Sequence, residues 1–320
     1  MRFGKTNLLA LALAATFIGL VNQSQAQSEA MSWKLAVGDR FKVSLNQNSS
    51  ALTKVESRKT LIENVTDLEM SWDVVKVTKE IATIEQAILG ISLAVSNPAV
   101  PSQAISFDTS ASEEDAKEYS KSSRALFKQI KPLIGMKFNV TMALNGEIKE
   151  VTLPPASAEV INQLPDTVRL RQLFSPEGLN AMLGASAFVF PEKPIDAGAS
   201  WTEKKSVATP LGEFARKRVY TVVGKKTVDG QELTEIRMEP RLEAEQEQAA
   251  ESESVKSSLD PKLISFSGSG ILMVDTQGGY LKSSSFENEL KSERPYREKT
   301  IETTVKNQIR MMINKLVEKK

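Results

Sequence analysis

The sequence of 320 residues contains no histidine and no cysteine, and these two absences remove most of the usual catalytic and metal-binding chemistry. Without them, Ser-His-Asp and Cys-His catalysis are excluded. Zinc sites built from histidine and cysteine are excluded as well. What remains is carboxylate chemistry, a lysine base, tyrosine, or a magnesium or calcium site with oxygen ligands.

Short catalytic motifs are also missing. No serine stands three residues before a lysine, which excludes the Ser-x-x-Lys acyl-transfer motif. The chain has no Gly-x-Ser-x-Gly elbow, no Gly-x-x-x-x-Gly-Lys phosphate loop and no Asp-x-[Asp/Asn]-x-[Asp/Asn]-Gly calcium loop. We therefore predict that the protein is not an enzyme and has no catalytic residue, no cofactor and no metal site.

Aromatic residues and excess charge are scarce. The three Trp and four Tyr argue against a dedicated carbohydrate binder. Residues 27–320 carry 39 basic groups (41 − 2) and 40 acidic ones, so their net charge is near −1. Nucleic-acid binding needs a clear basic excess, so nucleic acid is excluded as a partner.

The first 26 residues have the three-part layout of a cleavable signal peptide. Arg2 and Lys5 precede an apolar run of about 14 residues, and Ser24-Gln25-Ala26 offers a small-x-small cleavage site. The run is shorter than the roughly 20 residues of a membrane-spanning helix, although an uncleaved anchor is the alternative. No later segment could span a bilayer, and the absence of Cys excludes a lipoprotein. We expect an exported, soluble protein of the periplasm or the extracellular space.

Alternation of apolar and polar residues predicts strands along most of the remaining chain. Such segments occur around 41–45, 68–77, 82–88, 138–142, 148–151, 201–223, 233–238, 264–274, 280–290 and 301–313. A change of parity at Val75 and Val77 suggests a bulge or a second buried face. Asn145-Gly146, Asp229-Gly230 and Gln277-Gly278-Gly279 predict tight turns between antiparallel strands.

Helices are expected in two places. Ser112 followed by Glu113, Glu114 and Asp115 resembles a helix start, and Ala116, Tyr119, Ser123, Leu126 and Ile130 then share one face. Short helices are expected around 158–164, 166–173 and 176–183. The predicted fold class is α+β and β-rich, with two related antiparallel curved-sheet lobes. The predicted domains are the signal peptide (1–26), a first lobe (27–155) with a helical insert near 112–136, a helical linker (156–195) and a second lobe (196–320).

The two lobes share landmarks that suggest an internal duplication. A glycine, two residues and an aromatic open both halves, in Gly38-Asp39-Arg40-Phe41 and Gly198-Ala199-Ser200-Trp201. The distance from this glycine to the later turn glycine is 108 residues in the first half (146 − 38) and 80 in the second (278 − 198). The difference of 28 residues is close to the length of the helical insert. Coincidence is the alternative, because glycine-led turns are common in β proteins.

The same landmarks resemble an exported bacterial domain family of unknown function. The resemblance rests on Gly38-Asp39-Arg40-Phe41 and on Gly268-Ser269-Gly270 with Asp275 and Gly278. It spans most of the mature chain and implies no activity and no site residues. In layout the chain also looks like the half-barrel carriers of lipids and lipoproteins in the bacterial envelope, which is an analogy of fold and not of function.

Few residues stand out as ligand contacts. Trp72 and Trp201 are expected in the core, whereas Trp33 is a candidate for a ligand cleft together with Leu126 and Ile130 of the helical insert. Met311, Met312 and Ile313 are expected at a core-facing strand end, with an adaptable apolar site as the alternative. An acidic run is expected to be a solvated loop or a strand end rather than a calcium site. It comprises Glu243, Glu245, Glu247, Glu251 and Glu253.

Three functions stay open at this point, and they predict different surfaces. A non-enzymatic carrier of an apolar small molecule predicts an apolar cleft covered by Leu126 and Ile130. An interaction module for another envelope protein predicts no cleft. A histidine-independent hydrolase acting on glycans predicts paired carboxylates in a pocket, one of them with a raised pKa.

Overall fold

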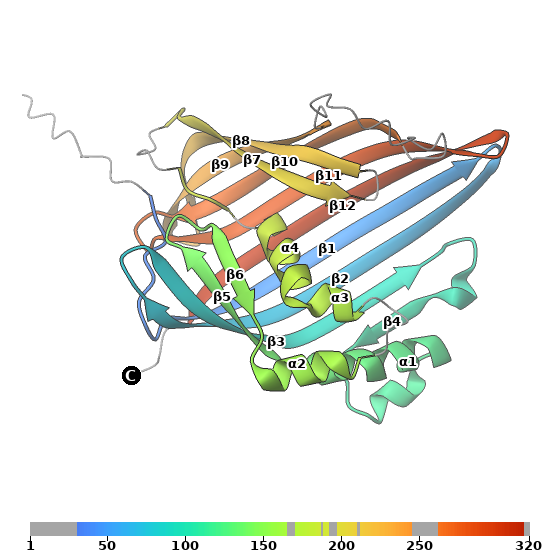
Figure 1. Ribbon diagram of the computed structural model, residues 1–320, viewed down its shortest axis with the longest axis horizontal. Coiled ribbons are helices and arrows are strands. Elements are labelled where there is room, and N and C mark those ends of the chain that lie inside the picture. Colours follow the sequence, from blue (N-terminus) through green and yellow to red (C-terminus); the bar gives the residue numbers. More distant parts are fainter. Residues whose placement is uncertain are drawn as a thin grey trace, which may run out of the picture.

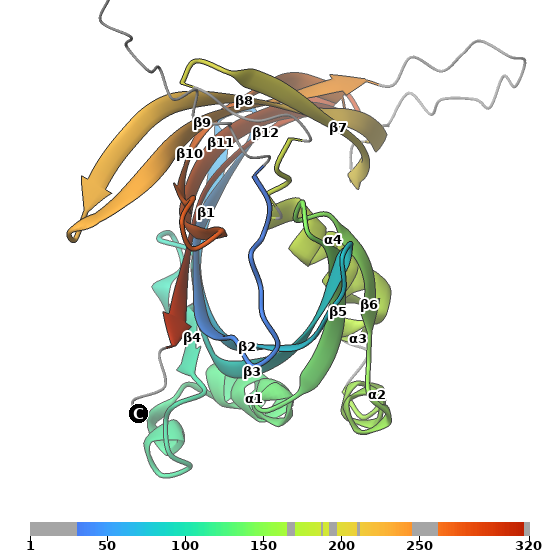
Figure 2. The ribbon, with the colours of Figure 1, turned by 90° about the vertical axis from the view of Figure 1, so that its left-hand side faces the viewer.

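The computed structural model of the chain describes residues 31–164, 170–186, 188–191, 197–209, 212–244 and 262–316. Antiparallel strands dominate these ranges and form one curved, open sheet (Figures 1 and 2). The strands are β1 (Arg40–Val55), β2 (Arg58–Val77), β3 (Ile81–Ser96), β4 (Ile105–Asp108), β5 (Lys137–Ala143), β6 (Ile148–Thr152), β7 (Ser200–Thr209), β8 (Gly212–Val228), β9 (Gln231–Ala244), β10 (Lys262–Asp275), β11 (Tyr280–Tyr296) and β12 (Lys299–Leu316).

The sheet is continuous from one half of the chain to the other. Its order is β6-β5-β3-β2-β1-β12-β11-β10-β9-β8-β7, with β4 added on β3. The first and last strands join the two halves of the sheet. β1 pairs with β12 along the whole length of β1, from Arg40 opposite Leu316 to Val55 opposite Ile301. The predicted β-rich, antiparallel, curved fold is confirmed. The division into two lobes and a linker, and the duplication of the lobes, stay predictions.

Several local predictions of the strands are confirmed. The change of parity near Val75 corresponds to a bulge, where the register of β2 against β3 shifts between Val74 and Lys76. The Asn145-Gly146 and Asp229-Gly230 turns join β5 to β6 and β8 to β9, and both glycines have positive φ. Most strands are longer than their apolar stretches predict: β3 continues from Ile88 to Ser96.

Helices occur in the two predicted regions. The insert holds α1 (Lys121–Ile130), and the linker region holds α2 (Pro155–Asn162), α3 (Leu170–Phe174) and α4 (Pro176–Ser186). Three short 3₁₀ turns are η1 (Pro101–Gln103), η2 (Asp115–Glu118) and η3 (Lys131–Leu133).

The helix predicted to begin at Ser112 begins later, at Lys121. Tyr119 has an extended backbone (φ −62°, ψ 148°), which separates η2 from α1. Ser120 is the N-cap of α1, since its side chain accepts a hydrogen bond from the Ser123 backbone N–H. The Ser112 hydroxyl donates instead to Asp115, at 2.7 Å. The expected helix start therefore supports only the 3₁₀ turn.

The main core lies on one face of the sheet. Strand residues alternate between faces, and Phe41, Val43, Met70 and Ile84 are all buried on the same one. We call this face the inner face. Figure 2 shows β1, β2, β3, β5 and β6 curling around it, with residues 31–39 running along the inner side of this curve. In Figure 1, α3 and α4 lie in front of β1 and β2.

Candidate functional site

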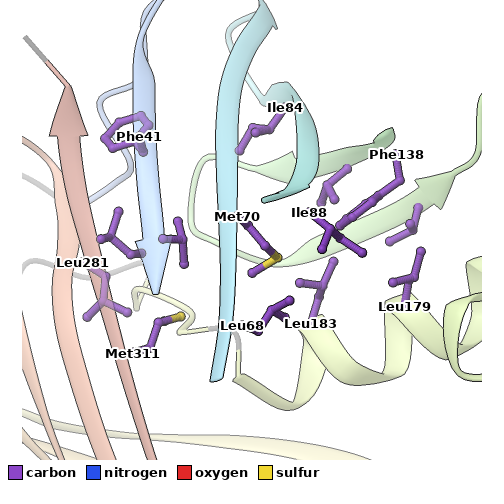
Figure 3. Close-up of a cluster of buried hydrophobic side chains, with 14 of the residues drawn as sticks. Phe41, Leu68, Met70, Ile84, Ile88, Phe138, Leu179, Leu183, Leu281 and Met311 are labelled. Carbon is purple, nitrogen blue, oxygen red and sulfur yellow. The ribbon is translucent and has the colours of Figure 1, made fainter. Parts of the chain in front are cut away.

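The inner face is covered by chain segments from outside the sheet. Leu183 of α4 points toward Leu68 and Met70 of the sheet, whereas Leu179 of the same helix lies farther from these two residues (Figure 3). Leu179 is fully buried and Leu183 is 7% exposed. A helix laid over an apolar sheet face buries that face without closing the sheet into a barrel.

Two further segments, the one around Trp33 and residues 188–191, lie over the inner face at the β5–β6 hairpin. Together with α4 we call them the cover. The Trp33 backbone N–H donates to the Leu144 carbonyl at 2.7 Å, and the Phe190 N–H donates to the Asn145 carbonyl at 2.7 Å. Both segments are therefore hydrogen-bonded to the same turn. Gly146 lies between them, and a Cβ atom there would stand 2.2 Å from the Phe188 carbonyl oxygen and 2.7 Å from Trp33 Nε1. The turn needs glycine for this close approach as well as for its φ of +97°.

A small cavity of about 60 Å³ lies between the inner face and its cover. Its walls are almost entirely apolar. They are formed by Trp33, Leu45, Met70, Trp72, Ile84, Gln86, Val140, Met142, Gly146, Ile148, Leu183, Phe188, Leu281, Met311 and Ile313. The cavity is smaller than the roughly 150 Å³ that accommodates benzene in an engineered apolar core, so a larger ligand must displace part of the cover.

Three buried polar atoms at this cavity have no hydrogen-bond partner in the protein. They are the indole Nε1 of Trp33, the indole Nε1 of Trp72 and the side-chain carbonyl Oε1 of Gln86. Trp33 is 4% exposed and Gln86 is 2% exposed. An unpaired polar group in an apolar surrounding costs about 1–3 kcal/mol, so three at one cavity are unfavourable for the stability of the fold.

An aromatic cluster connects the cover to the second half of the sheet. Phe188 contacts Phe190 (ring centroids 4.8 Å apart), Tyr220 (5.4 Å) and Trp201 (6.1 Å). Trp201 stacks on Tyr220, whose hydroxyl donates to Glu203 at 3.0 Å. Phe188 thus lines the cavity on one side and is held by the aromatic cluster on the other. Burial raises the pKa of the Tyr220 hydroxyl well above its ordinary value.

A second concavity, the polar groove, lies toward the far ends of the long strands. It is open, has a volume of about 880 Å³, and is lined by Asn48, Ser49, Ser50, Glu63, Asn64, Val65, Ala94, Ser96, Ser267, Gly268, Ser269, Glu287, Asn288, Glu289, Lys306, Asn307 and Gln308. Asn48 and Ser50 stand an odd number of residues from Val43 on β1, so they project from the face opposite the inner face.

The side chains of the polar groove pair with one another across strands. Glu289 accepts ion-pair contacts from Lys306 (3.2 Å) and Lys291 (2.9 Å), and the Asn307 amide donates to Asn288 at 3.0 Å. Hydrogen bonds from Lys291 and Lys306 lower the pKa of the Glu289 carboxyl. A general acid needs the opposite shift. Within the described ranges, no three acidic, histidine or cysteine side chains gather in a way that could hold a metal ion.

The sequence-predicted contact residues lie in different places. Trp33 lines the cavity, whereas Leu126 and Ile130 are on α1, which packs beside β4. The helix that contributes to the cavity is α4. Ligand contact by Trp33, Leu126 and Ile130 stays a prediction, and the geometry favours Trp33.

Sequence patterns missed Gln86 and the cavity role of Trp72. Trp72 was expected in the core, and it is partly buried and packed against it. Met311 is buried on the inner face, as expected of a core-facing strand end, but Met312 is 52% exposed. Gln86 occupies an inward position in the alternation of β3, and a polar residue at such a position is the signal that could have identified it.

Some predictions lie outside the described residues. These are the signal peptide (1–26) and Glu245, Glu247, Glu251 and Glu253 of the acidic run, whereas Glu243 lies on β9. In the part of the chain that the structure describes, no helix has the length and apolar character needed to cross a membrane.

Comparison with solved structures yields distant similarities. Lipovitellin, in a structure of its lipid–protein interactions, gives a TM-score of 0.45 at 9% identity; the match covers 89% of this chain and 26% of lipovitellin. An outer membrane channel from Pseudomonas putida F1 gives 0.21 at 8% identity, covering 90% of this chain and 98% of the channel. A DUF1329 family protein from Desulfovibrio piger gives 0.13 at 8% identity, with 87% of both chains covered. These scores are too low to define a shared function.

Sequence comparison identifies a family without an assigned function. No curated protein sequence matches the chain. A family model described as a family of unknown function, DUF6263, matches residues 91–263, which is more than half of the chain. The predicted resemblance to a family of unknown function is confirmed, although Gly38, Gly268 and the other residues that suggested it lie outside the matched segment. The chain belongs to the DUF6263 family.

Proposed function

We propose that this protein is a non-enzymatic, exported carrier of the cell envelope, which holds an apolar small molecule against the inner face beneath α4. The observation that carries the proposal is the apolar cavity at the junction of the sheet with Trp33, Leu183 and Phe188. These three side chains come from covering segments and not from the sheet. A ligand can therefore enlarge the cavity by displacing the cover while the paired strands stay in place.

The apolar inner face continues beyond the cavity and offers room for a longer ligand. Leu45 lies opposite Met311, and two residues along β12 Ile309 lies opposite Phe286. Leu45 and Phe286 are only partly buried. An alkyl chain that starts in the cavity would bury their remaining surface, at about 25 cal/mol per Å² of apolar area.

Binding of the neutral fluorescent probe N-phenyl-1-naphthylamine to the purified full chain tests the proposal. We expect saturable binding by the wild type. Leu183→Ala enlarges the cavity and is expected to bind the probe several-fold more tightly. Leu179→Ala is the matched control, because Leu179 is buried on the same helix one turn away but does not line the cavity. Absence of saturable binding, or an equal gain in both variants, would contradict the proposal.

The polar groove favours a second candidate function, an interaction module for a polar surface of another envelope protein. Its volume is large and its cross-strand pairs offer both donors and acceptors. A specific partner complex that is lost in Ser50→Arg and kept in Leu183→Ala would support this function. The reverse pattern would support the carrier. A glycan hydrolase is the weakest candidate, because the lowered pKa of Glu289 opposes a role as general acid.

A further inference from the structure

The cavity beneath α4 presents a specific set of polar atoms within apolar walls. Two are donors, the indole N–H groups of Trp33 and Trp72, and one is an acceptor, the Oε1 carbonyl of Gln86. Gln86 lies opposite Trp72 in the β2–β3 register, and the rings of Trp33 and Trp72 lie 6.4 Å apart. Gln86 and Trp72 are therefore neighbours on the inner face of the sheet, and Trp33 of the covering segment lies against Trp72.

The cavity has no charged wall. Its lining contains no Lys, Arg, Asp or Glu side chain among the described residues. A carboxylate or phosphate placed there would be a buried charge without a partner, which is strongly unfavourable. A neutral polar group faces no such penalty, so the walls select against anionic headgroups.

A hydroxyl group is complementary to this set of polar atoms. It has one O–H donor and two acceptor lone pairs. The cavity supplies two donors and one acceptor, so one hydroxyl offers the matching complement. An ether or ester oxygen can accept from an indole N–H but cannot donate to Gln86. A pure hydrocarbon leaves all three groups unpaired.

We propose that the ligand class is a neutral apolar molecule with a hydroxyl group, which donates to Gln86 and accepts from the indoles of Trp33 and Trp72. This inference rests on the proposed carrier function and specifies its ligand. The cavity of about 60 Å³ holds the hydroxyl-bearing end. The hydrocarbon part follows the inner face past Leu45 toward Phe286.

Competition against bound N-phenyl-1-naphthylamine tests the headgroup. The competitors are 1-decanol, its methyl ether 1-methoxydecane, and decanoate at about pH 8, added to the full chain. We expect the alcohol to displace the probe at about fivefold to tenfold lower concentration than the ether, as one additional hydrogen bond predicts. Decanoate is expected to be the weakest competitor.

Two kinds of variant separate the roles of the polar groups. Gln86→Leu removes the acceptor, so the alcohol and the ether should compete equally well; Gln86→Met is the alternative if the leucine variant does not fold. Trp72→Phe removes a donor that both competitors use. It should weaken both by a similar factor and preserve the preference for the alcohol.

The outcomes distinguish this inference from the proposed function. If the wild type binds the probe but the alcohol and the ether compete equally, or decanoate competes best, the hydroxyl inference is wrong and the carrier function stands. If the alcohol preference survives in both Gln86 variants, the assignment to Gln86 is wrong. If the wild type does not bind the probe at all, the carrier function fails as well.

Discussion

The two ends of the same strands have opposite characters. On β1, Phe41 and Val43 are buried on the inner face, whereas Gln47 and Ser49, farther along the same face, are only partly buried. Both ends belong to one hydrogen-bonded ladder with the same antiparallel partners. Figure 1 shows β1, β2, β11 and β12 extending beyond the helices at this far end. Backbone hydrogen bonds between strands therefore hold the whole sheet together. The apolar core and the cavity lie only where the cover packs on the inner face.

The largest effect should come from removing a core side chain beneath the cover. Ile313→Ala, at a fully buried position of β12, is expected to lower the free energy of unfolding by about 3 kcal/mol, as is usual for buried Ile. Ile301→Ala lies on the same face of the same strand but at the polar end, and should cost about 1 kcal/mol or less. Urea unfolding measures both. Equal losses would contradict the contrast between the two ends.

A smaller effect is expected from the turn that carries the cover. Gly146→Ala places a Cβ against Phe188 and Trp33 and should destabilise the protein by about 2 kcal/mol or more. Gly135→Ala is the control, because Gly135 also has positive φ (+83°) but nothing within 4 Å of its Cβ position. It should show the backbone strain alone, about 1 kcal/mol. Thermal unfolding of both variants gives the difference, and no difference would mean that the close approach is unimportant.

The smallest effect concerns the buried hydroxyl of Tyr220, next to the cover. Its pKa is raised by burial, so above about pH 10 the unfolded chain loses this proton while the folded chain keeps it. Stability should therefore fall as pH rises above 10, by up to about 1.4 kcal/mol per pH unit from this one group. Tyr220→Phe lacks the group and should lose less stability over the same range. Parallel slopes for the two proteins in urea unfolding from pH 8 to 11 would contradict the assignment.

The sequence predicted the near end of the sheet better than the far end. Phe41, Val43 and Met70 alternate with polar residues because one face of their strands is buried and the other is not. Toward Asn48 and Ser50 both faces are polar, so the alternation disappears although the strand continues. Ladder hydrogen bonds with neighbouring strands sustain this part, and they leave no signature in a single sequence.

The candidate site could be predicted only in part. Trp33 was identified as a candidate contact, and the apolar strand ends that form the walls follow from alternation. The cover could not be assigned, because Leu126 and Ile130 of α1 have the same helical spacing of apolar residues as Leu179 and Leu183 of α4. Which helix lies over the inner face depends on the path of the chain after β6. The pairing of Gln86 with Trp72 depends on strand register, which the bulge at Val75 shifts.

Contact between a bound apolar molecule and the cavity tryptophans tests the central claim most directly. In Trp201→Phe, the only remaining tryptophans are Trp33 and Trp72, and both line the cavity. Titration with 1-bromodecane, whose bromine quenches indole fluorescence on contact, should produce strong, saturable quenching in this variant. Quenching should be much weaker in the Trp33→Phe/Trp72→Phe double variant, which retains Trp201 alone. Equal quenching in the two proteins, or quenching that never saturates, would contradict binding beneath α4.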